Sequence, residues 1–88
     1  MVDQKFKSLR EQRILEIFLK ELRKKSGLRQ VDVASSLGIP QSMVSKYEAG
    51  ERRVDVLEVR EICHLFGISL LEFVEELEKR LEGNDETD

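Results

Sequence analysis

Cysteine, histidine, proline and tryptophan are almost absent from this sequence. Its 88 residues include one cysteine, one histidine, one proline and no tryptophan. A lone cysteine cannot form an internal disulfide, and Cys63 with the neighbouring His64 supplies too few ligands for a metal site. No nucleophile, base and acid are spaced for joint catalysis either. The sequence therefore predicts a protein that is not an enzyme and that uses no metal and no cofactor.

Long hydrophobic runs are missing as well. The longest apolar stretch, residues 68–74, is interrupted by Ser69 and Glu72, whereas a membrane-spanning helix needs about 20 consecutive apolar residues. The first ten residues are mixed and charged, without the apolar centre of a signal peptide. We therefore expect a soluble, cytoplasmic protein that has no membrane partner.

Positive charge is scarce overall but unevenly distributed. The formal net charge is -3, yet residues 1–53 hold twelve Lys and Arg against seven Asp and Glu, and residues 54–88 hold three against eleven. Because attraction to phosphate depends on the local field of the docking face, the basic half can bind nucleic acid while the acidic half faces away. Charge alone leaves open the alternative that these runs are only solvated helix faces.

Capping residues and glycines divide the chain into five helices, with no strand alternation and no internal repeat. Ser or Asp followed three residues later by Glu satisfies free amides at a helix start, and glycine permits the left-handed backbone that ends a helix. The predicted helices begin at Ser8, Gln30, Pro40, Asp55 and Ser69. The last helix is expected to end at about Glu82, so residues 1–82 form one domain and the acidic residues 83–88 form a disordered tail.

The fourth of these helices should carry one apolar face toward the core. Its inward residues are predicted to be Val56, Val59, Ile62, Cys63 and Phe66. At such a position Cys63 is expected to be a buried, unreactive thiol, and the adjacent His64 should point outward.

Residues 30–49 satisfy the demands of two helices that cross steeply over a short turn. Ala34 is small where the two helices approach, Gly38 permits the turn, and Val44 is apolar where the second helix of the pair meets the core. The rest of the apolar cluster is formed by Val33, Leu37, Ile39 and Tyr47.

The segment Leu28–Arg53, which contains this pattern, resembles the lambda-repressor-like (Cro/Xre) helix-turn-helix family. The resemblance extends to Ile68–Leu70. The resemblance covers about Phe18 to Val74 and leaves residues 1–13 outside the family pattern. It implies an all-α fold, namely a five-helix lambda-repressor-like domain with extended first and last helices. It also implies that the third helix enters the major groove of double-stranded DNA.

The resemblance assigns base contacts to the outer face of the third helix, through Gln41, Ser42, Ser45 and Lys46. Such side chains suit the role because Gln pairs bidentately with an adenine edge and Ser donates or accepts a hydrogen bond. The alternative for Gln41 and Ser42 is that they only help to cap the helix. Tyr47 is expected to be a core residue.

Four further residues are expected at the DNA backbone: Gln30, Arg29, Arg52 and Arg53. Gln30 matches the family's phosphate-contacting Gln at a helix start, and the two later arginines lie in the loop after the third helix. Arg29 stands where the family usually has a Ser or Thr cap, whose loss costs about 1 kcal/mol. Val54 replaces a frequent Pro, which leaves the loop less rigid.

The fifth helix carries more apolar residues than a small core requires. We predict that it forms a homodimer interface through Leu71, Val74, Leu77 and Leu81. Leu70, Val74, Leu77 and Leu81 step by four, three and four residues, which is a coiled-coil-like seam about two heptads long. The alternative is that this seam belongs to the core. The competing dimer surface is the long first helix, with Phe6, Leu9 and Ile14. A twofold dimer would place two recognition helices about 34 Å apart on a pseudo-palindromic site.

The sequence thus favours a dimeric, sequence-specific transcriptional regulator, of the repressor or controller type, that binds an operator. An alternative is an antitoxin that uses the same DNA-binding fold and sequesters a toxin protein as its partner. A third hypothesis, a protein-interaction module that has lost DNA binding, is favoured only by the acidic pI of about 5.3.

Overall fold

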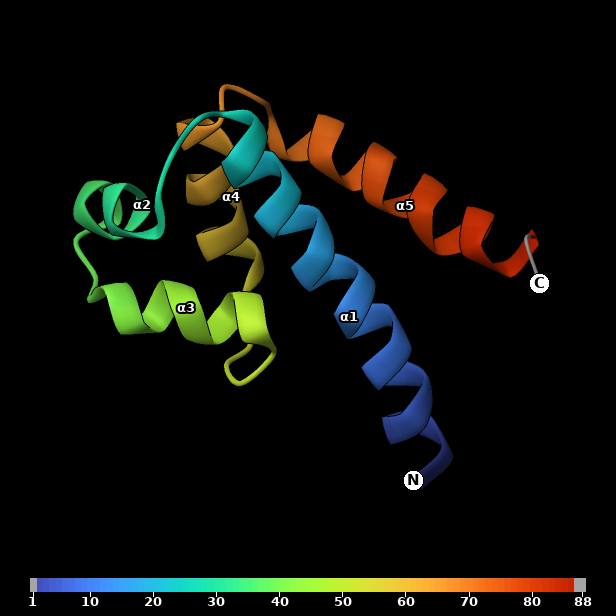
Figure 1. Ribbon diagram of the computed structural model, residues 1–88. Coiled ribbons are helices and arrows are strands. Elements are labelled where there is room, and N and C mark those ends of the chain that lie inside the picture. The colour runs from blue at the N-terminus through green and yellow to red at the C-terminus, as the bar shows by residue number, and fades with distance from the viewer. Residues whose placement is uncertain (1, 87–88) are drawn as a thin grey trace.

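The protein is all-α, as its sequence predicts. The computed structural model describes the backbone of residues 2–86 and the side chains of residues 9–83. Over this range the chain forms five helices and no strand: α1 (Val2–Lys25), α2 (Gln30–Leu37), α3 (Gln41–Ala49), α4 (Val56–Leu65) and α5 (Leu70–Glu86) (Figure 1). In this part of the chain, no helix combines the length and the apolar content that crossing a membrane requires.

Both outer helices are longer than predicted. Helix α1 begins at Val2 rather than at Ser8, because residues 2–7 contain no proline or glycine that would stop the helix. Helix α5 continues to Glu86, past the helix end expected at about Glu82. One glycine lowers helix stability by only about 1 kcal/mol and does not by itself end a helix. Residues 87 and 88 lie outside the described residues.

Two of the predicted capping boxes are confirmed. Asp55 accepts a hydrogen bond from the backbone N–H of Glu58 at 2.8 Å, and the Glu58 carboxylate accepts one from the N–H of Asp55 at 3.0 Å. Ser69 and Glu72 form the same reciprocal pair at the start of α5, at 3.0 and 2.8 Å. These pairs fix where α4 and α5 begin.

The core lies where the four helices α1–α4 meet α5. Its buried members are Phe18, Leu19, Val33, Ala34, Val44, Tyr47, Val59, Ile62, Cys63 and Phe73. Leu37 and Ile39 pack against this core from half-buried positions, as does Phe66. The apolar cluster expected from the helix-turn-helix pattern is therefore present.

The predictions for α4 are confirmed with one exception. Cys63 is fully buried, and this burial raises the pKa of its thiol to about 11, which makes it unreactive. His64 is exposed. Val56, however, was expected to face inward and is 61% exposed, like the neighbouring Leu57 at 69%, because the neighbouring helices do not cover the first two residues of α4.

A stack of three side chains fastens α5 to α1. The rings of Phe18 and Phe73 lie parallel with their centroids 4.8 Å apart, and the Arg80 guanidinium sits 4.1 Å from the centroid of Phe18. Arg80 also pairs with Glu21 of α1 at 2.9 Å and with Glu76 of its own helix at 3.2 Å. In the view of Figure 1 the two helices diverge toward their free ends.

Candidate nucleic-acid interface

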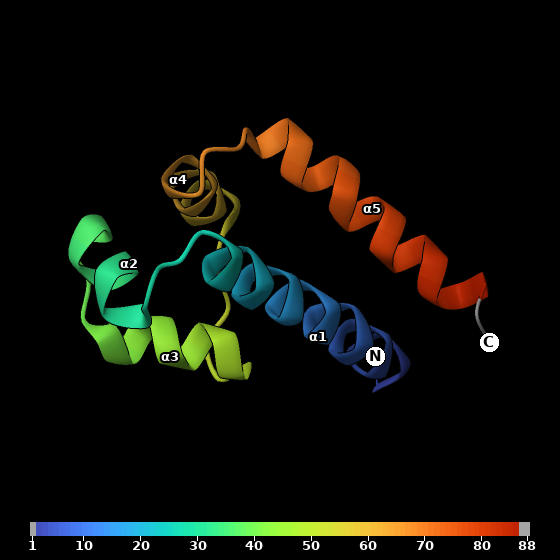
Figure 2. The same cartoon turned by 45° about the horizontal axis from the view of Figure 1, so that its top comes forward.

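The turn between α2 and α3 has the geometry that its sequence predicts. Gly38 ends α2 with a left-handed backbone (φ 71°), which a side chain would strain. The N–H of Ile39 then donates to the carbonyl of Ala34 at 3.0 Å. Ala34 is 3% exposed and Val44 fully buried, so α2 and α3 meet closely and cross steeply (Figure 2).

Helix α3 presents one polar face to solvent. Val44 and Tyr47 point into the core, which leaves the opposite side of the helix exposed. The exposed side chains there include all four residues expected to contact bases, Gln41, Ser42, Ser45 and Lys46. Tyr47 is 3% exposed, and burial raises the pKa of its phenol to about 12. It is therefore a core residue, as predicted.

A polar network beneath this face joins three helices. The Arg23 guanidinium of α1 donates to both carboxylate oxygens of Glu48 in α3, at 2.6 and 3.1 Å, and to the carbonyl of Leu28 at 2.9 Å. Gln30, the first residue of α2, donates its amide N–H to Glu48 at 3.0 Å. The amide of Gln41 in turn donates to the side-chain oxygen of Gln30 at 3.4 Å.

This network determines how the two glutamines are turned. A carboxylate only accepts hydrogen bonds, so Glu48 must face the amide nitrogen of Gln30, and the oxygen of Gln30 is then left for Gln41. Gln41 keeps its own carbonyl oxygen and one N–H for a ligand. That donor and acceptor pair is what a bidentate contact with adenine requires.

Sequence reasoning missed Arg23 and Glu48. They are the charged residues of the network, with side chains only 10% and 3% exposed, and their hydrogen bond raises the pKa of Arg23. A signal was present, because each stands four residues after a buried apolar residue, Leu19 or Val44, and therefore on the inward face of its helix.

Arg29 occupies the N-cap of α2 without an acceptor of its own. Asp32 compensates: its carboxylate accepts from the backbone N–H of Arg29 at 2.8 Å and from its guanidinium at 3.0 and 3.1 Å. These hydrogen bonds lower the pKa of Asp32. The Arg29 side chain is 78% exposed and lies beside Gln30 at the start of the helix.

The two arginines of the loop after α3 face different ways. Arg52 turns toward α4 and pairs with Glu58 at 2.8 Å, with its other terminal nitrogen buried and unpartnered in the described structure. Arg53 is exposed. The arrangement leaves Arg53 available to a ligand and pairs Arg52 with the helix that follows.

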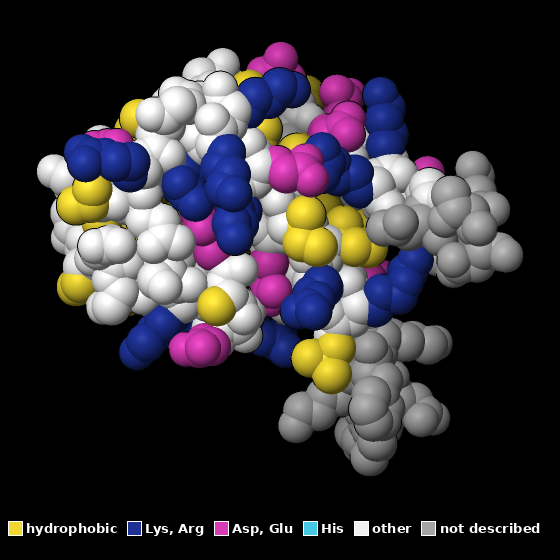
Figure 3. Space-filling view, viewed as in Figure 1, with side chains coloured by type: hydrophobic (Ala, Val, Ile, Leu, Met, Phe, Trp, Pro, Cys, Tyr) yellow, Lys and Arg dark blue, Asp and Glu magenta, His cyan; other side chains and the backbone are white. Residues whose placement is uncertain are grey.

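Basic side chains lie around the helix pair, interspersed with acidic ones. Figure 3 shows Lys and Arg side chains spread over this face of the molecule, from the helix pair across α1, with Asp and Glu side chains among them. In the described chain no group of three or more His, Cys, Asp and Glu could hold a metal ion. A short helix pair, a polar outer helix face and basic surroundings together define a helix-turn-helix DNA-binding domain.

Comparison with known proteins supports this class. A helix-turn-helix family model matches residues 19–73. A solved structure of an XRE-family like protein from Pseudomonas syringae pv. tomato str. DC3000 is similar over 89% of this chain and 95% of that one, with 35% sequence identity and a TM-score of 0.80. No curated protein matches the sequence. The chain belongs to the Cro/Xre-like helix-turn-helix family.

Proposed function

We propose that the protein is a dimeric, sequence-specific transcriptional regulator of the repressor or controller type, which inserts α3 into the major groove of an operator. The observation that carries this proposal is the outer face of α3, where Gln41 is exposed and held by the Gln30, Glu48 and Arg23 network. A side chain held in place loses less conformational entropy when it binds, which favours a specific contact over a general one.

The base contacts follow from the free hydrogen-bonding groups of α3. Gln41 offers an oxygen and an N–H to one adenine, and the hydroxyls of Ser42 and Ser45 donate or accept at neighbouring edges. Lys46, one turn from Ser42, suits the oxygen and nitrogen acceptors of guanine. All four side chains are exposed on one face, which supports their assignment as a set.

Phosphate contacts flank this face on two sides. Gln30 keeps a second amide N–H at the start of α2, where free backbone amides and the helix dipole attract an anion. Arg29 lies beside it, and Arg53 lies beyond the far end of α3. Arg52 completes the proposed set; like Arg29, which pairs with Asp32, it would exchange a carboxylate partner, Glu58, for phosphate.

The proposed dimer uses α5. Leu71 is 71% exposed and Val74 39% exposed, and exposed leucines and valines at such spacing are typical of a helix that packs against a partner. Leu77 and Leu81 are half-buried at the far end of the same helix. A twofold axis there would present two copies of α3 to successive major grooves about 34 Å apart.

Selection of bound sequences from a random pool of duplexes tests the proposal. We expect a consensus with twofold symmetry and an affinity that falls with salt. Gln41→Ala should lower affinity at particular base pairs by about 1 to 3 kcal/mol and leave other positions unchanged. His64→Ala, at an exposed site on α4 away from α3, is the control. Equal loss on every sequence would contradict the role given to Gln41.

A further inference from the structure

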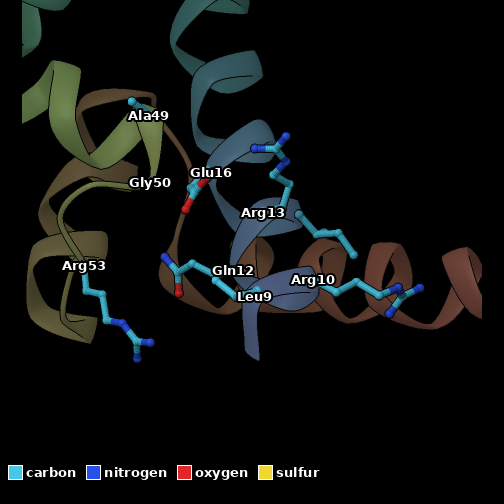
Figure 4. A pocket seen from close by; sticks show the side chains of 9 residues that line it. Leu9, Arg10, Gln12, Arg13, Glu16, Ala49, Gly50 and Arg53 are labelled. Atoms are coloured by element: carbon cyan, nitrogen blue, oxygen red, sulfur yellow. The ribbon is translucent and has the colours of Figure 1, made fainter. Parts of the chain in front are cut away.

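One hollow of the described molecule has no role in the fold or in the contacts above. It is an open cleft of about 660 Å³ between the amino-terminal half of α1 and the end of α3. Figure 4 shows its walls: Arg10 and Arg13 come from α1, while Gly50 and Arg53 come from the other side.

Two arginines from separate elements line the cleft, Arg13 of α1 and Arg53 of the loop after α3, together with one acidic residue, Glu16. Arg13 and Arg53 are both exposed, and neither makes a hydrogen bond or ion pair with another described side chain. In Figure 4, Arg53 lies on one side of Gln12 and Glu16, whereas Arg10 points away from the wall formed by Ala49 and Gly50. An exposed guanidinium can donate two parallel hydrogen bonds to a phosphate.

Glu16 is the acidic residue of the lining, and it is far less exposed than Arg13 and Arg53. It is 7% exposed, and its carboxylate lies against Gly50, where a Cβ atom would come within 2.6 Å of it. A side chain at position 50 would therefore require this carboxylate to shift.

The position of the cleft identifies the anion. Ala49 and Gly50, which form one wall, end helix α3, and Arg53 follows three residues later. A duplex bound to the outer face of α3 therefore extends past this opening. Its phosphodiester backbone is an extended polyanion, and Arg13 lies within a cleft that opens beside the backbone contact proposed for Arg53.

We infer that this cleft binds the DNA backbone at the flank of each half-site, through Arg13 of α1 together with Arg53. The inference rests on the proposed function and adds a contact from α1, the helix whose amino-terminal part lies outside the helix-turn-helix segment. It makes the extended α1 part of the DNA interface. The contact reads no sequence, since phosphates carry no base identity.

Salt-dependent binding of Arg13→Gln tests the inference. We expect affinity to fall by about tenfold, equally on specific and unrelated duplexes, as for loss of one charge-assisted contact. The slope of log affinity against log salt should become shallower by roughly 0.9, the value for one phosphate. Lys25→Gln is the matched control: it removes the same charge from an exposed site on the same helix, in the hollow that faces α5, and should change neither quantity.

Three results would overturn the inference. The first is an Arg13→Gln variant with wild-type affinity and salt slope. The second is a loss that vanishes once protein concentration exceeds the dimer dissociation constant, measured by analytical ultracentrifugation; the cleft would then be a protein-binding surface. The third is a wild-type chain that binds no duplex, which overturns the proposed function as well. If the wild-type chain binds duplex DNA and Arg13→Gln binds it equally well, the inference fails while the proposed function stands.

Discussion

Glu48 links three helices through its side-chain carboxylate. Glu48 belongs to α3, and its carboxylate accepts hydrogen bonds from Arg23 of α1 and from Gln30 of α2. Its side chain and that of Arg23 are almost completely buried, so each charge depends on the other for compensation. Removing one partner of such a pair leaves an uncompensated buried charge, which costs more than the pair contributes when intact.

Glu48→Gln should therefore destabilise the fold by about 2 to 4 kcal/mol. The measurement is urea unfolding, followed by circular dichroism. Glu51→Gln, an exposed site three residues later, makes the same chemical change and should shift the midpoint very little. Similar losses of unfolding free energy in the two variants would show that the ion pair with Arg23 does not stabilise the fold more than an exposed carboxylate does.

Cys63 and Tyr47 predict a loss of stability in alkali. Burial raises the pKa of Cys63 to about 11 and that of Tyr47 to about 12, from ordinary values of 9.0 and 10.0. Above pH 9 the unfolded chain releases the thiol proton while the folded chain keeps it. Stability must therefore fall as pH rises, by about 1 kcal/mol at pH 10 from the thiol.

Unfolding free energies between pH 8 and pH 11 measure this effect. In Cys63→Ala the decline should begin near pH 10, where Tyr47 starts to contribute, instead of near pH 9. An unchanged profile in this variant would contradict the assignment to the thiol.

At the scale of elements, two glycines end helices in the same backbone conformation but differ in their surroundings. Gly38 has φ 71° with nothing within 4 Å of the place where a Cβ would be, whereas Gly50 has φ 82° and the Glu16 carboxylate at 2.6 Å. The first allows the turn between α2 and α3. The second also lets the end of α3 approach α1.

Substitution by alanine should separate these two effects. Gly38→Ala is expected to cost about 1 to 2 kcal/mol, from backbone strain alone. Gly50→Ala should cost somewhat more, because the Glu16 carboxylate must shift away from the new methyl group. Unfolding of both variants in the Glu16→Ala background completes a double-mutant cycle, in which the excess at Gly50 should disappear. If Gly50→Ala still destabilises the fold more than Gly38→Ala in the Glu16→Ala background, contact with Glu16 is not the cause.

At the scale of the whole molecule, the proposed operator contacts require a second copy. Leu71 on α5 and Leu57 on α4 are nearly equally exposed, at 71% and 69%, but only Leu71 shares its face with Val74 at a spacing of three residues. Because the recognition face of α3 lies away from α5, a partner on α5 would leave it uncovered.

Leu71→Gln should weaken dimerisation at least tenfold, as expected when about 1.4 kcal/mol or more of apolar burial is lost. Analytical ultracentrifugation measures the dimer, and operator affinity should fall with it. Leu57→Gln is matched in exposure and chemistry and should leave both unchanged. If Leu57→Gln dissociates the dimer and Leu71→Gln does not, the partner lies on α4.

Local sequence determined the elements of this fold, since capping pairs such as Asp55 with Glu58 and the αL glycines act within a few residues of the helix ends. It also determined the helix-turn-helix, because Ala34, Gly38 and Val44 act within one helix pair. The ends at Val2 and Glu86 were not predictable in the same way, since no strong stop signal marks them. Their lengths follow from continued helical propensity.

Only the tertiary structure decided what the charged residues do. Arg23 and Glu48 lie 25 residues apart in sequence, and no local rule pairs them. Arg52 and Arg53 are neighbours of the same type, yet Glu58 holds one and leaves the other exposed. Local periodicity decides which side of a helix is buried. The partner of a long charged side chain depends instead on which side chains the packing of the other helices places within its reach.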